Sequence, residues 1–213
     1  MAAAKKQEVE KIVIPALEIK DFDLHIIGDS PLISHAWSEK AKLMMLQKQM
    51  KKATKGRDVR RPAVEYAESL YWLSEKPDFE NLTDEEIMEA TQEGRFGFPT
   101  LAFKAAAVDA GYQQGVLDKK TTARGAIHVV GEFAEIAGKP NIREDVGRIG
   151  LGTADLRYRA EFKDWSTVLH IRYNVNAISL EQVCNLFNVG GFACGVGDWR
   201  PAKDGIYGQY HCE

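Results

Sequence analysis

Apolar and polar residues alternate in two stretches of the chain, residues 22–27 and residues 167–173. A period of two residues is typical of a strand that buries one face of a sheet. Residues 156–162 and the end of the chain also have strand patterns, and residues 163–166 are predicted to form the turn between two of these strands. A weaker strand pattern covers residues 126–136, where the apolar positions shift by one residue part of the way along.

Between these strands, apolar residues recur every three to four positions, which is the period of a helix with one apolar face. Helices are predicted over residues 34–52, from Pro62, from Thr83, over residues 99–110 and from Ser179. Proline is favoured in the first turn of a helix because the N–H group that it lacks has no partner there. Two of the helices begin with a capping box, in which Thr83 is followed by Glu86 and Ser179 by Gln182.

Several glycines predict where these helices end. Gly111 can close the helix that starts at Pro99, and Gly190 or Gly191 can supply the left-handed residue that ends the last helix. The glycine-rich, mixed-charge residues 138–154 are predicted to form a long loop or a hairpin. The first helical stretch, residues 34–52, gathers its basic residues towards its C-terminal end, where the helix dipole favours cations.

The loop that follows the last helix has an unusual composition. Residues 191–201 hold Gly195 and Gly197, which let the backbone approach another group closely, together with Trp199 and Arg200, which offer a stacking plane and a cation. A loop of this composition is either a tight structural crossover or a binding loop, and its local pattern leaves both alternatives open.

The order of elements predicts an α+β fold. Without the helical stretch at residues 34–95, the order approximates β-α-β-β-α-β, which is the ferredoxin-like or RRM-like arrangement. We therefore predict a core domain formed by residues 1–33 and 96–213, with residues 34–95 as an inserted helical lobe.

Composition limits the class of protein. With 213 residues and 45% apolar residues, the chain is expected to form one globular domain with a satellite insertion. It lacks a run of about 18 apolar residues and the apolar core of a signal peptide, so we predict no membrane contact and a cytoplasmic location. Its three cysteines lack metal-ligand spacing and are expected to be inert thiols. We predict no metal site and no cofactor.

The net charge of −3 conceals a strong asymmetry. From Lys40 to Arg61 there are nine basic residues and one acidic residue, a net charge of +8, so the remainder carries −11. Lys48, Lys51, Lys52 and Lys55 recur at helical spacing. The segment is either a solvated helix facing acidic protein surface or a contact with a phosphate backbone. On the second interpretation its binding residues are Lys48, Lys51, Lys52, Lys55, Arg57, Arg60 and Arg61.

Catalytic motifs have little support. Gly147, Gly150 and Gly152 do not match the order of a dinucleotide-binding fingerprint, and the chain has no GxxxxGK[ST] or GxSxG sequence. The five histidines are scattered, and those in strand patterns are expected to be ordinary sheet residues. We therefore predict that the protein is not an enzyme. A small hydrolase or transferase would need a polar catalytic cluster that the sequence does not show.

Three separated stretches resemble the RAMP superfamily, the RRM-like proteins that form the backbone of CRISPR effector complexes in antiviral defence. Residues 24–33 (LHIIGDSPLI) resemble its first strand and glycine turn, and residues 98–108 (FPTLAFKAAAV) resemble its proline-initiated first helix. Residues 191–201 with 205–210 are similar to its C-terminal glycine-rich loop before the last strand. These stretches fall in the family's order and cover about a quarter of the chain. The chain also resembles uncharacterised phage and prophage proteins in general character.

The resemblance implies an RRM-like palm and repeated copies assembled along a guide RNA. It implies RNA contacts at the following positions: Ser34, His35, Lys104, Gly195, Gly197, Trp199 and Arg200. Some family members cleave RNA with an aspartate after the first strand. Asp58 is the nearest counterpart, but its flanking residues do not match, so no nuclease activity is predicted.

Together these observations predict a non-catalytic subunit that binds single-stranded RNA or DNA, with RNA as the favoured ligand. Copies of it are predicted to oligomerise along the strand, and other effector-complex subunits are predicted as further partners. The alternative is a phage structural or assembly protein whose basic helix contacts a protein neighbour.

Overall fold

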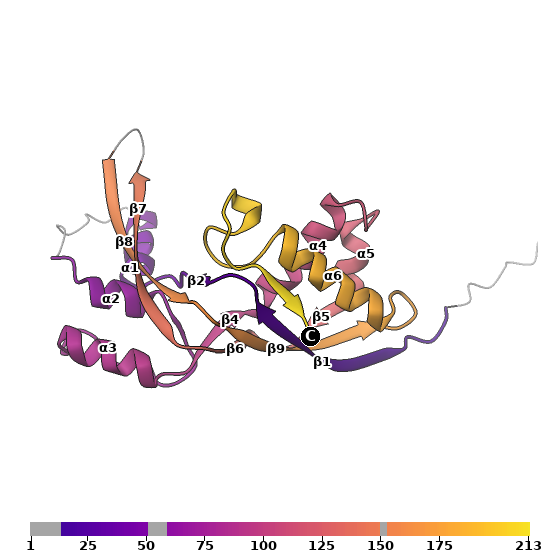
Figure 1. Ribbon diagram of the computed structural model, residues 1–213, viewed down its shortest axis with the longest axis horizontal. Helices are drawn as coiled ribbons and strands as arrows, with labels where there is room; N and C mark the ends of the chain where they lie inside the picture. Colours follow the sequence, from indigo (N-terminus) through magenta and orange to yellow (C-terminus); the bar gives the residue numbers. More distant parts are fainter. Residues whose placement is uncertain (1–13, 51–58, 150–152) are drawn as a thin grey trace, which may run out of the picture.

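The computed structural model describes residues 14–50, 59–149 and 153–213 (Figure 1). Within these ranges the chain forms helices and two antiparallel sheets, so the predicted α+β class is confirmed. The larger sheet has α-helices over one of its faces, and the smaller sheet extends into a long hairpin that projects from one end of the molecule.

The main sheet has the strand order β10-β1-β9-β6-β4-β3, and β5 also pairs with β9. Its strands are β1 (Ile19–Gly28), β3 (Tyr71–Trp72), β4 (Phe96–Pro99), β5 (Ile127–Val129), β6 (Phe133–Ala137), β9 (Ser166–Asn174) and β10 (Tyr210–Cys212). Its helices are α4 (Thr100–Gln113), α5 (Lys120–Ala126) and α6 (Leu180–Ala193). Figure 1 shows α4 and α6 on the same side of the sheet.

Alternation along β1 and β9 decides which face of the main sheet is buried. Leu24 lies opposite Leu169 in the register, and both side chains are buried under the helices. Their neighbours in the sequence, including His25 and His170, point to the other face and are exposed. The main sheet therefore has one face packed on helices and one open face that carries polar side chains.

The smaller sheet has the order β2-β8-β7 and consists of β2 (Leu32–Ser34), β7 (Pro140–Ile149) and β8 (Thr153–Phe162). Helix α2 (Pro62–Glu68) packs on β8, and α3 (Asp84–Glu93) packs on α2. The fully buried Tyr66 of α2 donates its hydroxyl to the carbonyl oxygen of Pro140, at 3.1 Å. Phe96 of β4 and Phe162 of β8 join the two sheets through ring contact, with centroids 6.2 Å apart.

The predicted helix starts are largely confirmed. Pro62 begins α2, and Thr83 and Ser179 cap α3 and α6 with both capping-box hydrogen bonds. The helix over residues 34–52 is shorter than predicted, because Ser34 belongs to β2 and α1 covers only Glu39–Gln49.

Other predicted boundaries are wrong. Residues 126–136 are not one strand but the end of α5, β5, a turn at Gly131 and the start of β6, which explains the shift in their apolar pattern. For residues 138–154 the hairpin alternative is confirmed, since their described residues include β7 and the start of β8, which pair with each other. Neither Gly111 nor the pair Gly190 and Gly191 ends a helix, since all three lie inside helices.

These buried glycines serve close packing instead. A Cβ atom on Gly190 would lie 2.7 Å from the backbone of Ala107 in α4, and one on Gly111 would lie 2.4 Å from the side chain of Leu186 in α6. The absence of a side chain allows α4 and α6 to approach each other at these points.

Candidate nucleic-acid interface

The loop between α6 and β10, residues 194–209, is here called the return loop. Gly195 and Gly197 have φ angles of 64° and 81°, in the left-handed region that favours glycine. A Cβ atom on Gly197 would lie 2.6 Å from the carbonyl oxygen of Ile33, and one on Gly195 would lie 3.0 Å from that of Gly208. The space beside these glycines is therefore filled by the protein's own backbone, as in a tight structural crossover.

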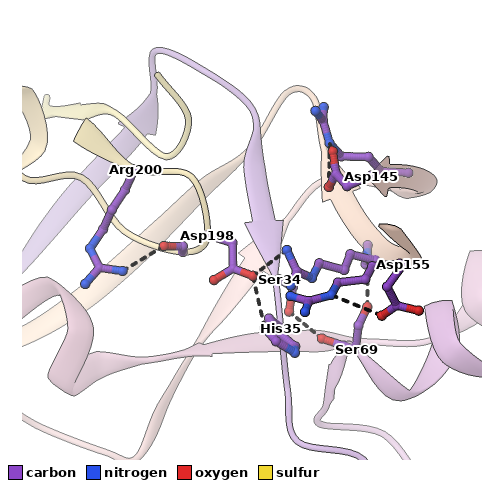
Figure 2. Close-up of polar contacts among 12 residues, drawn as sticks. Ser34, His35, Ser69, Asp145, Asp155, Asp198 and Arg200 are labelled. Carbon is purple, nitrogen blue, oxygen red and sulfur yellow. Dashed lines mark hydrogen bonds and ion pairs between the residues drawn. The ribbon is translucent and has the colours of Figure 1, made fainter. Parts of the chain in front are cut away.

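Asp198 anchors the return loop to the smaller sheet (Figure 2). Its carboxylate lies 3.0 Å from Nδ1 of His35 and 2.8 Å from Nη1 of Arg159, and its backbone N–H donates to Ile33. Arg159 is only 7% exposed, so Asp198 is the counter-ion of a buried charge. Burial on its own would raise the pKa of Asp198, but the hydrogen bond with His35 and the charge of Arg159 outweigh it and lower that pKa.

A second contact holds the return loop to the hairpin. The guanidinium group of Arg143 in β7 lies over the ring of Tyr207, 4.6 Å from its centroid. The same guanidinium is paired with Glu161 at 2.7 Å and with Asp145 at 2.9 Å. The return loop therefore bridges the main sheet and the hairpin, and this position brings Trp199 and Arg200 to the junction of the two sheets.

Trp199 and Arg200 differ in how available they are to a ligand. The Arg200 side chain is half-buried and donates from Nη1 to the carbonyl oxygen of Gly197, at 2.9 Å. The Trp199 side chain is 47% exposed, on a backbone with a φ of 53° that is unfavourable for a residue with a Cβ atom. Its carbonyl oxygen accepts from Tyr207, which holds this conformation in place. An exposed indole held in this way is a suitable stacking platform.

Ser34 and His35, predicted to contact RNA, follow one another at the end of β2. The hydroxyl of buried Ser34 donates to the carbonyl oxygen of Ser69, at 2.8 Å, and is therefore used within the protein. The His35 side chain is half exposed beside Asp198. Of the two, His35 presents the more accessible polar group.

The basic segment divides into three parts. Lys48 is exposed in the last turn of α1. Arg60 pairs with Glu65 at 2.6 Å and with Asp155 at 2.9 Å, while Arg61 pairs with Asp84 and donates to two backbone carbonyls. Lys51, Lys52, Lys55 and Arg57 lie outside the described residues, as does Asp58. Both described arginines therefore have their charge compensated by the protein itself.

Lys104 lies in the second turn of α4, away from the return loop. Its Nζ donates to the carbonyl oxygen of Arg124, at 2.9 Å, and burial together with the nearby charge of Arg124 lowers the pKa of Lys104. The structure therefore brings together His35, Trp199 and Arg200, and places Lys104 elsewhere.

A groove on the open face of the main sheet was not predicted. It has a volume of about 550 Å³ between β1, β9 and β6, and it is lined by apolar side chains together with His25 and His170. His170 is paired with Asp23 at 2.5 Å, as an ordinary sheet residue would be. A second hollow of about 560 Å³, which includes Lys104 and His128, shares Thr100 and Phe133 with the groove. The alternation in residues 22–27 and 167–173 indicated this face, but not that it is hollowed.

The thiols and the acidic groups offer little for catalysis or metal binding. Burial raises the pKa of the Cys184 and Cys194 thiols, and raises that of Cys212 to about 12, which disfavours a thiolate nucleophile. Among the residues that the structure describes, no three His, Cys, Asp or Glu side chains are grouped to hold a metal ion. No helix in the described ranges is long and apolar enough to cross a membrane.

No family model matches the chain, and no curated protein matches it in sequence. Among solved structures, the chain is similar to the crystal structure of Cmr6 from Pyrococcus furiosus, with 13% sequence identity. The match covers 93% of this chain and 100% of that chain, with a TM-score of 0.36. We draw no conclusion about fold or function from a similarity of this size.

Proposed function

We propose that the protein is a non-catalytic subunit that binds single-stranded nucleic acid, RNA in particular, and that copies of it assemble along the strand. The observation that carries this proposal is the separation of charge in the sequence, +8 between Lys40 and Arg61 against −11 in the rest of the chain. Cations concentrated in one segment neutralise phosphates and release counterions. Helix α1, which begins the segment, lies at the surface with its described lysines exposed.

The arrangement of the core supports the proposal. The elements β1, α4, β5–β6, β9, α6 and β10 follow one another along the chain, and their strands lie in the order β10-β1-β9-β6. This order is similar to that of the ferredoxin-like arrangement, which RRM proteins use to bind RNA, and it supports our proposal of such a core. The three stretches that resemble the RAMP superfamily lie in this core, and they favour other subunits of an effector complex as further partners.

Reversing the charge of Lys48 is expected to weaken binding to every single strand to a similar degree, because a phosphate contact carries no sequence information. Fluorescence anisotropy with labelled RNA and DNA strands at several salt concentrations measures this. For one lost phosphate contact, Lys48→Glu should reduce the slope of log affinity against log salt by about 0.7. The matched control is Lys163→Glu, which changes an exposed lysine in the turn between β8 and β9. An equal loss in both variants, or a wild-type protein that binds no strand at low salt, would contradict the proposal.

Trp199→Ala is expected to reduce the affinity for single strands without changing its salt dependence, since stacking releases no counterions. Loss of one base–aromatic contact corresponds to about a tenfold weaker affinity or more, and Trp199→Phe should retain part of it. Phe192→Ala is the matched control, because this ring at the end of α6 is 76% exposed. If Trp199→Ala binds as tightly as the wild type in the same anisotropy assay, the return loop is not part of the binding surface.

A second candidate function is that of a phage structural or assembly protein. It is favoured by the apolar side chains that α1 exposes beside its lysines, since exposed apolar patches mark protein contacts. The ratio of absorbance at 260 nm and 280 nm of the purified protein separates the two functions. Particles free of nucleic acid would favour the assembly protein, and copurifying strands would favour the strand-binding subunit.

A further inference from the structure

One ring nitrogen of His35 is available to a ligand. Nδ1 lies 3.0 Å from the carboxylate of Asp198 (Figure 2), and because a carboxylate only accepts hydrogen bonds, Nδ1 carries the proton of this contact. The residues that the structure describes form no hydrogen bond with Nε2, and half of the side chain is exposed. His35 therefore offers Nε2 to a ligand, with the ring oriented by the bond that Nδ1 makes.

Supporting contacts hold this imidazole in place. The hydroxyl of Tyr71 donates to the backbone carbonyl oxygen of His35, at 3.3 Å. Asp198, which orients the ring, is itself fixed by Arg159 at 2.8 Å and by its backbone N–H, which donates to the carbonyl oxygen of Ile33 at 3.1 Å. A polar group held in this way loses little freedom when it binds, so the contact is preorganised.

A stacking plane adjoins this polar group. Trp199 directly follows Asp198 in the chain, and its side chain is 47% exposed. Two other polar groups of the same region are used within the protein, since the hydroxyl of Ser34 and the guanidinium group of Arg200 both donate to backbone carbonyls. A base on Trp199 and a hydrogen bond with His35 would therefore belong to one nucleotide.

The proposed function limits which group of that nucleotide His35 can contact. A subunit whose copies follow one another along a strand meets every base, so a contact with base edges would weaken binding at unfavourable bases. A phosphate group is the same in RNA and DNA. The ribose 2′-hydroxyl is present on every RNA nucleotide, is absent from DNA, and both donates and accepts hydrogen bonds. It suits Nε2 in either state of the ring, because Nε2 accepts when the imidazole is neutral and donates when it is protonated.

We propose that Nε2 of His35 makes a hydrogen bond with the 2′-hydroxyl of the nucleotide whose base stacks on Trp199, and that this contact selects RNA over DNA. The proposal deepens the proposed function and rests on it: it names the residue through which a protein that binds single strands distinguishes the two sugars.

Fluorescence anisotropy with the full-length protein tests this on two labelled strands, oligouridine RNA and the same strand built from 2′-deoxyuridine. The wild type should bind the RNA about fivefold more tightly, which is the effect of one hydrogen bond. Two variants separate the ring nitrogens. The amide of His35→Asn reaches the position of Nδ1 and can keep the bond with Asp198, whereas the amide of His35→Gln reaches the position of Nε2. His35→Asn should bring the affinity ratio of the two strands close to one by weakening RNA binding alone, and His35→Gln should retain part of the ratio.

A role of His35 that is only structural, through Asp198, predicts the reverse order of these variants and would overturn the proposal. An equal loss for both strands in His35→Asn would also overturn it, because it indicates a phosphate contact. His170→Asn is the matched control: His170 is likewise exposed and paired with an aspartate, Asp23, but it lies on the open face of the main sheet and should keep the wild-type ratio. Since His35 is half exposed, its variants should retain the wild-type circular dichroism and thermal unfolding. A wild type that binds both strands equally refutes this contact alone, whereas one that binds neither strand refutes the proposed function as well.

Discussion

Gly191→Ala is expected to prevent the C-terminal strand from docking, although alanine is the better helix former by about 1 kcal/mol. Gly191 lies inside α6, where a Cβ atom would stand 1.9 Å from the carbonyl oxygen of Tyr210 and 2.7 Å from its ring. Tyr210 is fully buried and begins β10, which pairs with β1. Since the atom in the way is backbone, relief requires β10 or α6 to move. We expect a loss of about 3 kcal/mol or more in the free energy of unfolding.

Urea denaturation measures this loss, and Gly125→Ala is its matched control. Gly125 also lies inside a helix, α5, but a Cβ atom there would meet nothing within 4 Å. That variant should be as stable as the wild type, or more stable by up to about 1 kcal/mol. If both substitutions stabilise the protein, α6 and β10 are not in close contact, and the position of the return loop between them is wrong.

Asp198→Ala is expected to cost about 3 kcal/mol of stability, because it leaves the buried guanidinium group of Arg159 without a counter-ion. The same change removes the partner of His35 and one anchor of the return loop. Asp164→Ala, in the exposed turn between β8 and β9, is the matched control and should change stability by less than about 0.5 kcal/mol. Equal stability of the two variants in urea denaturation would show that Arg159 does not depend on Asp198.

The contribution of Asp198 should also depend on pH. Its pKa in the folded protein is lowered, because the hydrogen bond with His35 and the charge of Arg159 outweigh the effect of burial, while in the unfolded chain an aspartate has a pKa of about 3.9. The stabilisation is therefore fully present above the unfolded pKa and is lost as the pH falls through the lower folded value. The difference in stability between wild type and Asp198→Asn should shrink as the pH falls below about pH 4. A difference that stays unchanged as the pH falls from about pH 4 to pH 2 would contradict the ion pair.

Helix starts and the buried face of the main sheet could be predicted because they depend on neighbours in the sequence. The hydroxyl of Thr83 or Ser179 reaches an N–H group three residues on, and the alternation along β1 and β9 needs only a period of two. The helix ends assigned to Gly111, Gly190 and Gly191 were wrong for the opposite reason. What these glycines accommodate is another element, and local pattern cannot distinguish a glycine that ends a helix from one that lets two elements touch.

In the candidate site, too, the features that depend on neighbouring residues could be predicted, and those that depend on distant residues could not. The sequence alone identified the concentration of positive charge, and the stacking plane and cation that Trp199 and Arg200 bring to a glycine-rich loop. It could not show that Arg60 and Arg61 are neutralised by carboxylates, nor could it identify Asp198, whose partners come from β8 and the end of β2.

By itself, then, the sequence determined the α+β class, the capped helices, the strands with one buried face and the net charge of each segment. These follow from the chemistry of adjacent residues and from composition. Only the tertiary structure decided that the return loop is a crossover packed against its own chain, that the apolar side chains of α1 face solvent, and that the open face of the sheet is hollowed. Each of these depends on which elements, distant in the sequence, pack against one another. The free energy of burial and of ion pairing comes from those contacts and not from the order of neighbouring residues.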